Sequence, residues 1–468
     1  MASISSLGIG SGLDLNGLLD QLEAAEQKQL EPIVAQQASY EAKISAYGTL
    51  EGALNSFQEA VDKLGDPALY QSLSSSVEGE GVSASASELA TPGRYDVEVT
   101  RLARAQSLAS DGFDARDSEL GAGTLSLTVG DSEPVEISLS QEDSTLEGLR
   151  DAINDAEAGV SASIINTGDA DNPYRLVLSS DKTGSEASIS AVSFAPDDAA
   201  DTELQTKLAF DKDSLGADDS APGMHQSVAG EDAELTVNGI TITSASNSVE
   251  GAIEGVDLTL TDVGETTVKV EYNNLALREA VSGFVDSYNE LKDTMGTLTS
   301  FDAESGASGE LLGDATLRSI ESRLRGTLSG GVAQGDFRTL SDIGITLQLD
   351  GTLELDDERL DEVISSERGD LADFFTGGED GVGLSDSLDD TLGAILDDGG
   401  LLDNATSGLE TRMESLDRQY ERTEQSIDAT VERYRSQFGQ LDSMIASMNQ
   451  TSSYLTQQFD ALNAQLNQ

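Results

Sequence analysis

The feature that most constrains this chain is a run of apolar positions near its C-terminal end, spaced alternately by three and four residues. The run begins at Leu409, and its only repeated step of four lies between Ile427 and Val431. Fifteen of its seventeen positions are apolar and none is charged. This pattern is typical of a coiled-coil seam with one stutter, and it predicts a long coiled-coil helix over residues 406–468. The positions are Leu409, Met413, Leu416, Tyr420, Thr423, Ile427, Val431, Tyr434, Phe438, Leu441, Ile445, Met448, Ser452, Leu455, Phe459, Leu462 and Leu466.

A shorter stripe with similar spacing lies near the N-terminal end and stops at Gly65-Asp66-Pro67. It consists of Ile33, Tyr40, Ile44, Tyr47, Leu50, Leu54, Phe57, Val61 and Leu64. A lone amphipathic helix leaves its apolar face in water and loses conformational entropy when it forms. We therefore expect partners to cover both stripes, with an ordinary core helix as the alternative for the C-terminal run.

Both ends of the chain are also depleted of charge. Residues 1–22 and residues 437–468 each carry only two charged side chains, all four of them Asp, in a chain that is 24% charged. Because an unpaired charge is costly at a buried interface, this composition favours ends that become buried in an assembly. A polar tail that frays in water is the alternative.

The middle of the chain alternates apolar and polar residues in short runs, which is typical of β-strands. The expected strands cover residues 95–99, 125–129, 135–139, 160–165, 174–178, 233–237, 240–243, 256–260 and 267–270. Gly130-Asp131 and Asn238-Gly239 are hairpin signals. A short helix is expected from Thr145 to about Glu157, capped by Ser144 or Thr145. Helical spacing returns from about residue 273.

These patterns predict an α+β multidomain fold in which β-rich head domains are inserted between N- and C-terminal helical or coiled-coil segments. At roughly 150 residues per domain, the length suggests about three domains. The predicted division is an N-terminal flexible segment and helix at 1–72, an inner β-rich head domain at 73–112 plus 229–272, an outer α+β head domain at 113–228, a helical leg domain at 273–405 with part of 33–70, and a C-terminal coiled-coil helix at 406–468.

The charge balance excludes some classes of partner. With 26 Lys and Arg against 87 Asp and Glu, the net charge is −61. A protein that follows nucleic-acid phosphates needs a basic stripe, so we expect no nucleic-acid partner. The acid excess also suggests a salty environment that screens self-repulsion.

Residues 1–27 hold no Lys or Arg and no segment is long and apolar enough to span a membrane, so we expect neither a secretory signal nor a membrane span.

Motifs for catalysis or metal binding are weak in this chain. It has no cysteine, which excludes thiolate metal sites and thiol nucleophiles. The single His225 is expected in an exposed loop. A glycine run at residues 8–12 lacks a βαβ unit, an acidic segment at residues 169–171 lacks the glycine and glutamate of a calcium loop, and a carboxylate pair at residues 356–357 lacks an aromatic sugar platform. We therefore expect no catalytic residue, no cofactor and no metal site, and predict that the protein is not an enzyme.

Several segments are similar to one bacterial family. They are Ser6–Asp14, Thr91–Ala103, Ser341–Thr346, Gly351–Asp356, Phe374–Gly377, Tyr434–Phe438, Met448–Thr451 and Tyr454–Phe459. Together they resemble the flagellar hook-associated protein 2 family, the filament cap proteins. The resemblance runs from near residue 4 to near residue 460 and is weakest at residues 110–228.

This resemblance implies a non-enzymatic cap at the distal tip of the extracellular flagellar filament, exported unfolded through the flagellar type III channel. Such a cap promotes ordered incorporation of flagellin and prevents its loss, so filament elongation and motility depend on it. The resemblance further implies a homo-oligomer, expected to be a pentamer, with flagellin, hook-associated junction proteins and an export chaperone as partners. The residues expected to pack in the assembly are Leu7, Ile9, Leu13, Leu441, Ile445, Leu455, Phe459 and Leu462.

Two other functions remain open at this point. One is a surface adhesin that attaches the cell through its head domains, either instead of capping or together with it. The other is a different flagellar axial protein, such as a hook–filament junction subunit.

Overall fold

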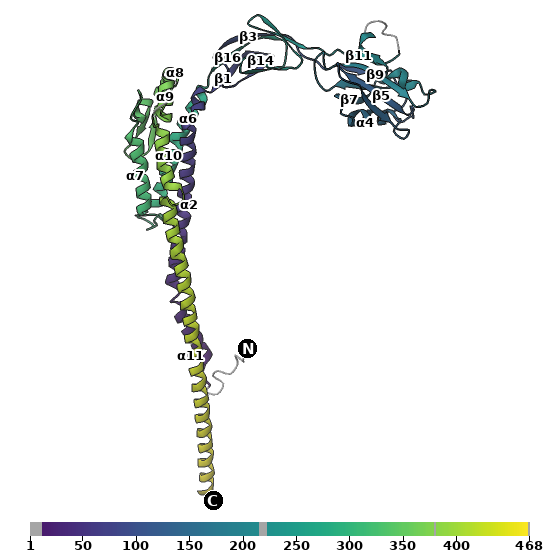
Figure 1. The fold of residues 1–468 in the computed structure, drawn as a ribbon. Helices are drawn as coiled ribbons and strands as arrows, with labels where there is room; N and C mark the ends of the chain where they lie inside the picture. Colours follow the sequence, from purple (N-terminus) through teal and green to yellow (C-terminus); the bar gives the residue numbers. More distant parts are fainter. Residues whose placement is uncertain (1–11, 215–221, 379–380, 467–468) are drawn as a thin grey trace. The chain divides into compact units, whose positions relative to one another are not determined.

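A computed structural model of the chain describes residues 12–214, 222–378 and 381–466. They fall into two compact units, which we call the helical unit and the β unit (Figure 1). The helical unit contains the residues up to Tyr70 and those from Asn274 onward, and the β unit is Gln71–Asn273. Along the sequence, helical segments therefore flank a β-rich middle, which confirms the predicted α+β class with β-rich parts inserted between helical ends.

The helical unit is built mainly from α-helices whose apolar faces meet in one core. They are α1 (Leu15–Gln27), α2 (Glu31–Gly65), α3 (Pro67–Gln71), α6 (Asn274–Thr299), α7 (Ala315–Gly330), α8 (Asp357–Ser366), α9 (Arg368–Thr376), α10 (Leu384–Leu396) and α11 (Leu401–Leu466), with a 3-10 helix at Leu340–Ile343 and a hairpin of β17 (Ile345–Leu347) and β18 (Leu353–Leu355). Helix α2 packs against α6, α10 and α11.

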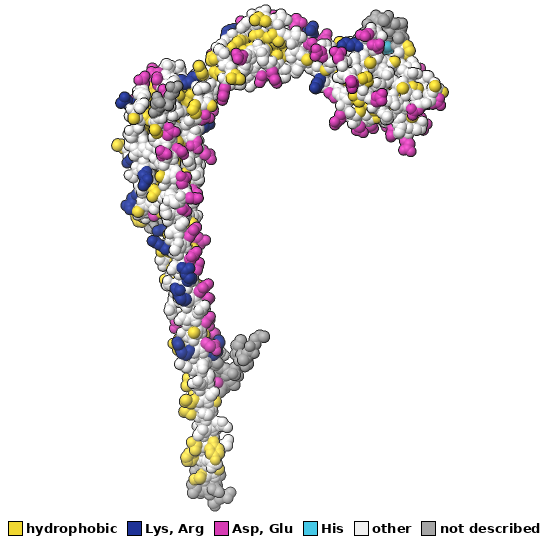
Figure 2. Space-filling model, in the orientation of Figure 1, with side chains coloured by type: hydrophobic (Ala, Val, Ile, Leu, Met, Phe, Trp, Pro, Cys, Tyr) yellow, Lys and Arg dark blue, Asp and Glu magenta, His cyan; other side chains and the backbone are white. Residues whose placement is uncertain are grey.

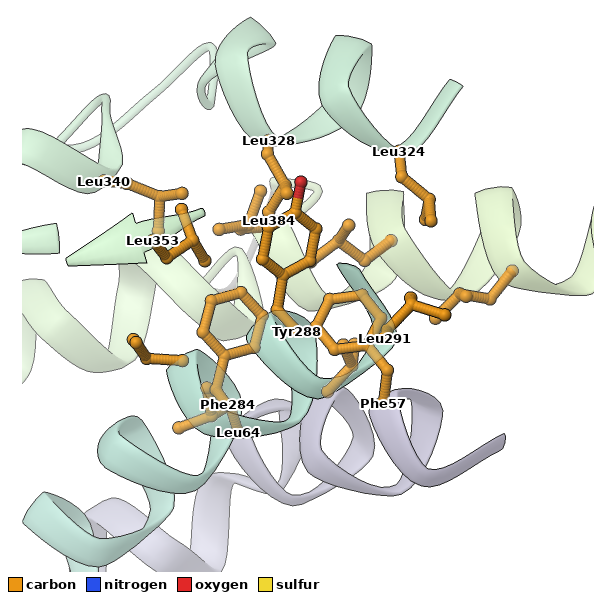
Figure 3. Packing of buried hydrophobic residues seen from close by; sticks show 14 of the residues in the cluster. Phe57, Leu64, Phe284, Tyr288, Leu291, Leu324, Leu328, Leu340, Leu353 and Leu384 are labelled. Atoms are coloured by element: carbon orange, nitrogen blue, oxygen red, sulfur yellow. The ribbon is translucent and has the colours of Figure 1, made fainter. Parts of the chain in front are cut away.

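Aromatic rings from α2, α6 and α9 lie at the centre of this core, and Figure 3 shows those of α2 and α6. The ring centroid of Phe57 is 5.4 Å from that of Phe284 and 5.5 Å from that of Tyr288. Phe375 meets Phe284 edge-on, with centroids 6.2 Å apart. Tilted and edge-on geometries suit the ring quadrupole and add to the gain from burial. Burial also raises the pKa of Tyr288.

The apolar stripe predicted near the N-terminal end lies on α2. Its residues from Tyr47 to Leu64 are buried in the core of the helical unit. Ile33, near the start of α2, is also buried. The chain itself therefore supplies the partner for most of this stripe, chiefly through α6 and α10.

The first of two hydrophobic cores in the β unit is shared by a five-stranded sheet, in the order β1-β16-β3-β12-β13, and a three-stranded sheet, in the order β14-β15-β2. The strands are β1 (Leu73–Gly79), β2 (Val82–Ala86), β3 (Gly93–Arg101), β12 (Ala233–Val237), β13 (Ile240–Ser244), β14 (Ser248–Ile253), β15 (Val256–Leu260) and β16 (Gly264–Tyr272). Leu73 pairs with Tyr272. The first and last strands of the β unit are thus antiparallel neighbours.

The second core belongs to two four-stranded sheets, in the orders β10-β9-β5-β6 and β11-β4-β8-β7, and to two helices. The elements are β4 (Ser107–Ala109), β5 (Gly123–Val129), β6 (Val135–Leu139), α4 (Leu146–Asp155), β7 (Val160–Asn166), β8 (Tyr174–Ser180), β9 (Ile189–Pro196), α5 (Glu203–Lys207), β10 (Phe210–Asp211), a 3-10 helix at Lys212–Ser214, and β11 (His225–Val228). Leu108 of β4 is fully buried in this core. The core therefore begins before residue 113, where the sequence places the outer domain, because β4 pairs with strands distant in sequence.

Two local predictions in the β unit are confirmed and one is wrong. Asn238 and Gly239 both have positive φ in the β12–β13 hairpin, as a type I′ turn requires. Thr145, rather than Ser144, caps α4 by accepting a hydrogen bond from the Gly148 amide. His225 is not in an exposed loop. It lies half-buried in β11, because that strand pairs with β4, and its Nε2 is 3.5 Å from Asp111 Oδ1.

Candidate assembly surface

Helix α11 carries the whole predicted seam on one helix of 66 residues, which confirms a long C-terminal helix. It begins at Leu401, before the predicted start at residue 406. Polar side chains fix this beginning: the Gly399 amide donates to the Asp403 carboxylate at 2.9 Å, and the Asn404 amide donates to the Gly399 carbonyl at 2.7 Å. Both contacts tie the backbone of Gly399, just before the helix, to side chains of the first helical turn.

The seam positions from Leu409 to Phe438, here called the proximal seam, are covered by α1 and α2 of the same chain. Leu19 of α1 packs with Ile427 and Val431, and all three are buried. Gln37 of α2 donates to the Asp417 carboxylate across the contact. The other side chains packed at the α1 contact are Leu30, Tyr434 and Phe438. This part of the seam is therefore a coiled coil within one chain.

The seam positions from Leu441 to Leu462, here called the distal seam, are mostly exposed. Leu441, Leu455, Leu462 and Phe459 are between 41% and 66% exposed, and Ile445 is half-buried. Figure 2 shows these hydrophobic side chains gathered on the last part of α11. Covering each of the four exposed side chains would contribute about 1 kcal/mol or more. The distal seam is thus a surface that a neighbouring apolar helix would cover with a gain in free energy.

Charge is scarce along the distal seam. Between residues 437 and 466 the only charged side chains are Asp442 and Asp460, and Asp442 is 8% exposed. A partner packed here would desolvate few charges, which is the costly part of burying a polar surface. Composition and exposure therefore agree that this stretch suits an interface.

The other predicted assembly residues have different outcomes. Leu13 is 51% exposed just before α1, whereas Leu7 and Ile9 lie outside the described residues. Met444 and Leu18 were not among the predicted assembly residues, yet they are 61% and 46% exposed. Met444 directly precedes Ile445 of the seam, and Leu18 directly precedes the buried Leu19. This position next to a predicted or buried apolar residue is the sequence signal that could have identified them.

The acidic pairs considered for chemistry have structural roles. The Asp356 carboxylate caps α8 by accepting from the amides of Glu358 and Arg359. The Asp169 carboxylate accepts from the amides of Asp171 and Asn172, and these hydrogen bonds lower the pKa of Asp169. Within the described ranges no group of three or more His, Cys, Asp or Glu side chains could hold a metal ion. No helix in those ranges combines the length and apolar content needed to cross a membrane.

Three family models match this chain. Residues 11–106 match the model of the flagellar hook-associated protein 2 N-terminus, and residues 230–450 match that of its C-terminus. Flagellar hook-associated protein 2 of Escherichia coli strain K12 is 39% identical over 98% of this chain and 99% of its own length. The chain belongs to the flagellar hook-associated protein 2 family. A second relative of the same name, from Salmonella typhimurium, is 37% identical over 99% of this chain and 100% of its own length.

A solved member of the family agrees with the fold. The crystal structure described as the D1-D2-D3 domains of the flagellar cap protein FliD from Escherichia coli is 35% identical, with a TM-score of 0.63. It covers 78% of this chain and 99% of that chain. Similarity in both sequence and fold therefore extends over most of the molecule.

The family models differ in how they cover the β unit and the end of α11. Residues 124–182 match the flagellin hook IN motif, within the region where the resemblance is weakest. Leu455, Phe459 and Leu462 lie beyond the end of the C-terminal model at residue 450. The case for the distal seam thus depends on its exposure and composition.

Proposed function

We propose that this protein is a subunit of the cap at the distal tip of the extracellular bacterial flagellar filament. There it promotes ordered incorporation of exported flagellin, prevents flagellin loss and so supports filament elongation and motility. Membership of the flagellar hook-associated protein 2 family and the likeness to a structure described as a flagellar cap protein support this function. The observation that carries it for this chain is the exposed, nearly uncharged distal seam.

The mechanism that fits this surface is exchange of non-covalent contacts, without an enzymatic step. Each exposed side chain of the distal seam gains about 1 kcal/mol or more on burial, so the contact is made of many small contributions. Contacts of this kind are exchanged stepwise more readily than one large preformed interface. An incoming flagellin subunit would displace a cap contact as its own apolar helices become buried.

The proposed partners follow from this function. We infer a homo-oligomer, a pentamer by the family resemblance, that contacts flagellin and the hook-associated junction proteins and is accompanied before export by a chaperone. The proposed assembly contacts are Leu7, Ile9, Leu13, Leu441, Ile445, Leu455, Phe459 and Leu462. The division into head, leg and coiled-coil domains also stays a prediction.

No observation favours the adhesin or junction-protein alternatives over capping. The relatives compared above carry the name hook-associated protein 2, and the structure described as FliD is a cap protein. The acidic surface of the β unit gives no reason to name an adhesive ligand.

The test is Leu455→Asp combined with Phe459→Asp, introduced as the sole copy in the source bacterium. We expect the variant to melt like the parent protein, because both side chains are exposed, yet to leave cells without filaments and with flagellin in the medium. Electron microscopy of cells and immunoblots of the medium measure this.

The matched control is Ser453→Asp with Gln457→Asp, which adds the same two charges on the opposite side of the same helical turns at about 100° per residue. Both residues are exposed, and the control should support normal filaments. Normal filaments in the Leu455→Asp and Phe459→Asp strain would reject the proposed function.

A further inference from the structure

Helix α11 sorts its charged side chains by sign onto two different faces. At about 100° per residue, its acidic side chains up to Glu432 fall within a sector of about 80°, and four arginines fall in a second sector whose centre is about 130° away. The acidic stripe is Asp403, Glu410, Glu414, Asp417, Glu421, Glu424, Asp428 and Glu432, and the basic stripe is Arg412, Arg418, Arg422 and Arg433. Arg435 alone departs from this division. Figure 2 shows the acidic and basic side chains on different sides of α11.

The sorting by sign is unfavourable for a solitary helix. Glu410 and Glu414 are like charges four residues apart, and so are Asp417 and Glu421. Such pairs repel one another on a helix surface, whereas opposite charges at this spacing attract. A helix whose charges only face water would gain by mixing the signs. The sorting therefore indicates that each stripe meets a surface of opposite charge.

The members of the two stripes that are best placed to contact a partner have no ion-pair partner in the described part of the chain. Glu410, Glu421, Arg412 and Arg422 are exposed, and none of them forms an ion pair with another described residue. The apolar sector between the two stripes is already occupied by α1 and α2 along the proximal seam. Both charged stripes therefore remain on the outer surface of the helical unit.

The acidic and basic residues of the two stripes also lie at nearly the same positions along the helix axis. Glu410, Glu421 and Glu432 recur every eleven residues, which is close to three helical turns. Arg422 and Arg433 repeat at the same interval, each one residue after an acidic member, and Arg412 follows Glu410 by two residues. The axial offset between an acid and its neighbouring arginine is thus at most about 3 Å, at 1.5 Å per residue.

We propose that the helical units of neighbouring copies contact one another side by side, with the acidic stripe of one α11 against the basic stripe of the next. We choose a second copy of this chain as the partner because its α11 carries a stripe of opposite charge at the same level along the helix axis. The contact joins two different surfaces, so it repeats from copy to copy. The small axial offset makes the relation between copies mainly a rotation, which closes a ring. This contact rests on the proposed homo-oligomer and specifies how its helical units associate.

The test uses two full-length variants with opposite surfaces. Arg412→Glu with Arg422→Glu brings the net charge of the basic stripe from +4 to zero, and Glu410→Arg with Glu421→Arg brings that of the acidic stripe from −8 to −4. Each variant alone should assemble about tenfold more weakly than the parent protein, since repulsion replaces attraction at exposed pairs. An equimolar mixture should restore assembly, because each substituted position can then face a side chain of opposite charge on the other variant. Sedimentation velocity at low and high NaCl measures this, and salt should weaken the parent contact.

The matched control is Lys63→Glu with Arg323→Glu, which makes the same change in net charge as Arg412→Glu with Arg422→Glu, at exposed positions of the helical unit outside α11. It should assemble like the parent protein, and all variants should melt at the parent temperature. Normal assembly of each stripe variant alone, or a mixture no better than its components, would overturn the contact while leaving the cap proposal intact. A parent protein that stays monomeric under all conditions would overturn the homo-oligomer and this contact together.

Discussion

At the scale of single residues, each of the three residues in the segment Asp342-Ile343-Gly344 meets a different requirement of the fold. The Asp342 carboxylate accepts hydrogen bonds from the amides of Arg338 and Thr339, at 2.9 and 2.8 Å. Ile343 is fully buried, and Gly344 has a φ of +91°, at which a side chain is strained. The three residues thus supply a cap, a core contact and a left-handed helix end, which are separate physical requirements.

Replacing Asp342 with Asn removes the charge from the group that accepts these amides, so at neutral pH it should lower stability by less than the about 0.5–2 kcal/mol that complete loss of a capping side chain costs. The backbone hydrogen bonds hold the pKa of Asp342 below its ordinary value of 3.8. Its carboxylate therefore stabilises the fold above that value, and this contribution is lost as the pH falls through the lowered pKa. The difference from the parent protein in urea unfolding should narrow below about pH 4. Asp336→Asn, at a nearby exposed carboxylate, should cost little; a gap that widens on acidification would contradict this account.

At the scale of elements, α11 is one helix with two environments. Its proximal seam is packed by α1 and α2, while its distal seam is mostly exposed. Helices of this kind owe most of their stability to packing of the apolar face. The distal part should therefore open more often than the proximal part, although both belong to the same continuous helix.

Limited digestion with a protease that cleaves after aromatic residues should test this difference. In the isolated protein we expect early cuts at Tyr454 and Phe459, slow cuts at the half-buried Tyr420 and Tyr434, and a resistant β unit. Mass spectrometry of the fragments over time gives the order. Uniform resistance from end to end would show that the distal seam is already packed in the isolated protein.

At the scale of the whole molecule, the net charge of −61 produces repulsion among side chains throughout the protein. The described ion pairs involve side chains that are mostly exposed, and such pairs contribute little to stability. Mutual repulsion among 87 carboxylates therefore opposes the compact state and is weakened only by salt.

The apparent melting temperature should consequently fall when NaCl is reduced from molar to millimolar concentration. The Debye length grows from about 3 Å at 1 M to about 30 Å at 0.01 M, so repulsion reaches more neighbours. Calorimetry across this range measures the effect, and the salt dependence should shrink near the sequence pI of about 4.1. An unchanged melting temperature would mean that the acid excess is not an adaptation to salt.

Sequence patterns predicted much of the secondary structure because those patterns are local. The nine predicted strands, the Asn238-Gly239 hairpin and the long C-terminal helix follow from periodicity and turn chemistry within short windows. His225 was misplaced, and the packing of β4 in the second core of the β unit was not foreseen, for the same reason. Each depends on a pairing with strands far away in the sequence, which no local window contains.

Some properties of the candidate assembly surface can likewise be read from the sequence, and others only from the tertiary structure. The apolar spacing of α11 and the scarcity of charge near its end are properties of the sequence, fixed by which side chains share a helical face. Which part of that face stays open was decided only by the tertiary structure, where Leu19 covers Ile427 and Val431 but leaves Phe459 exposed. The physical reason is that a helix pattern fixes the direction of each side chain, whereas burial depends on what the rest of the chain brings against it.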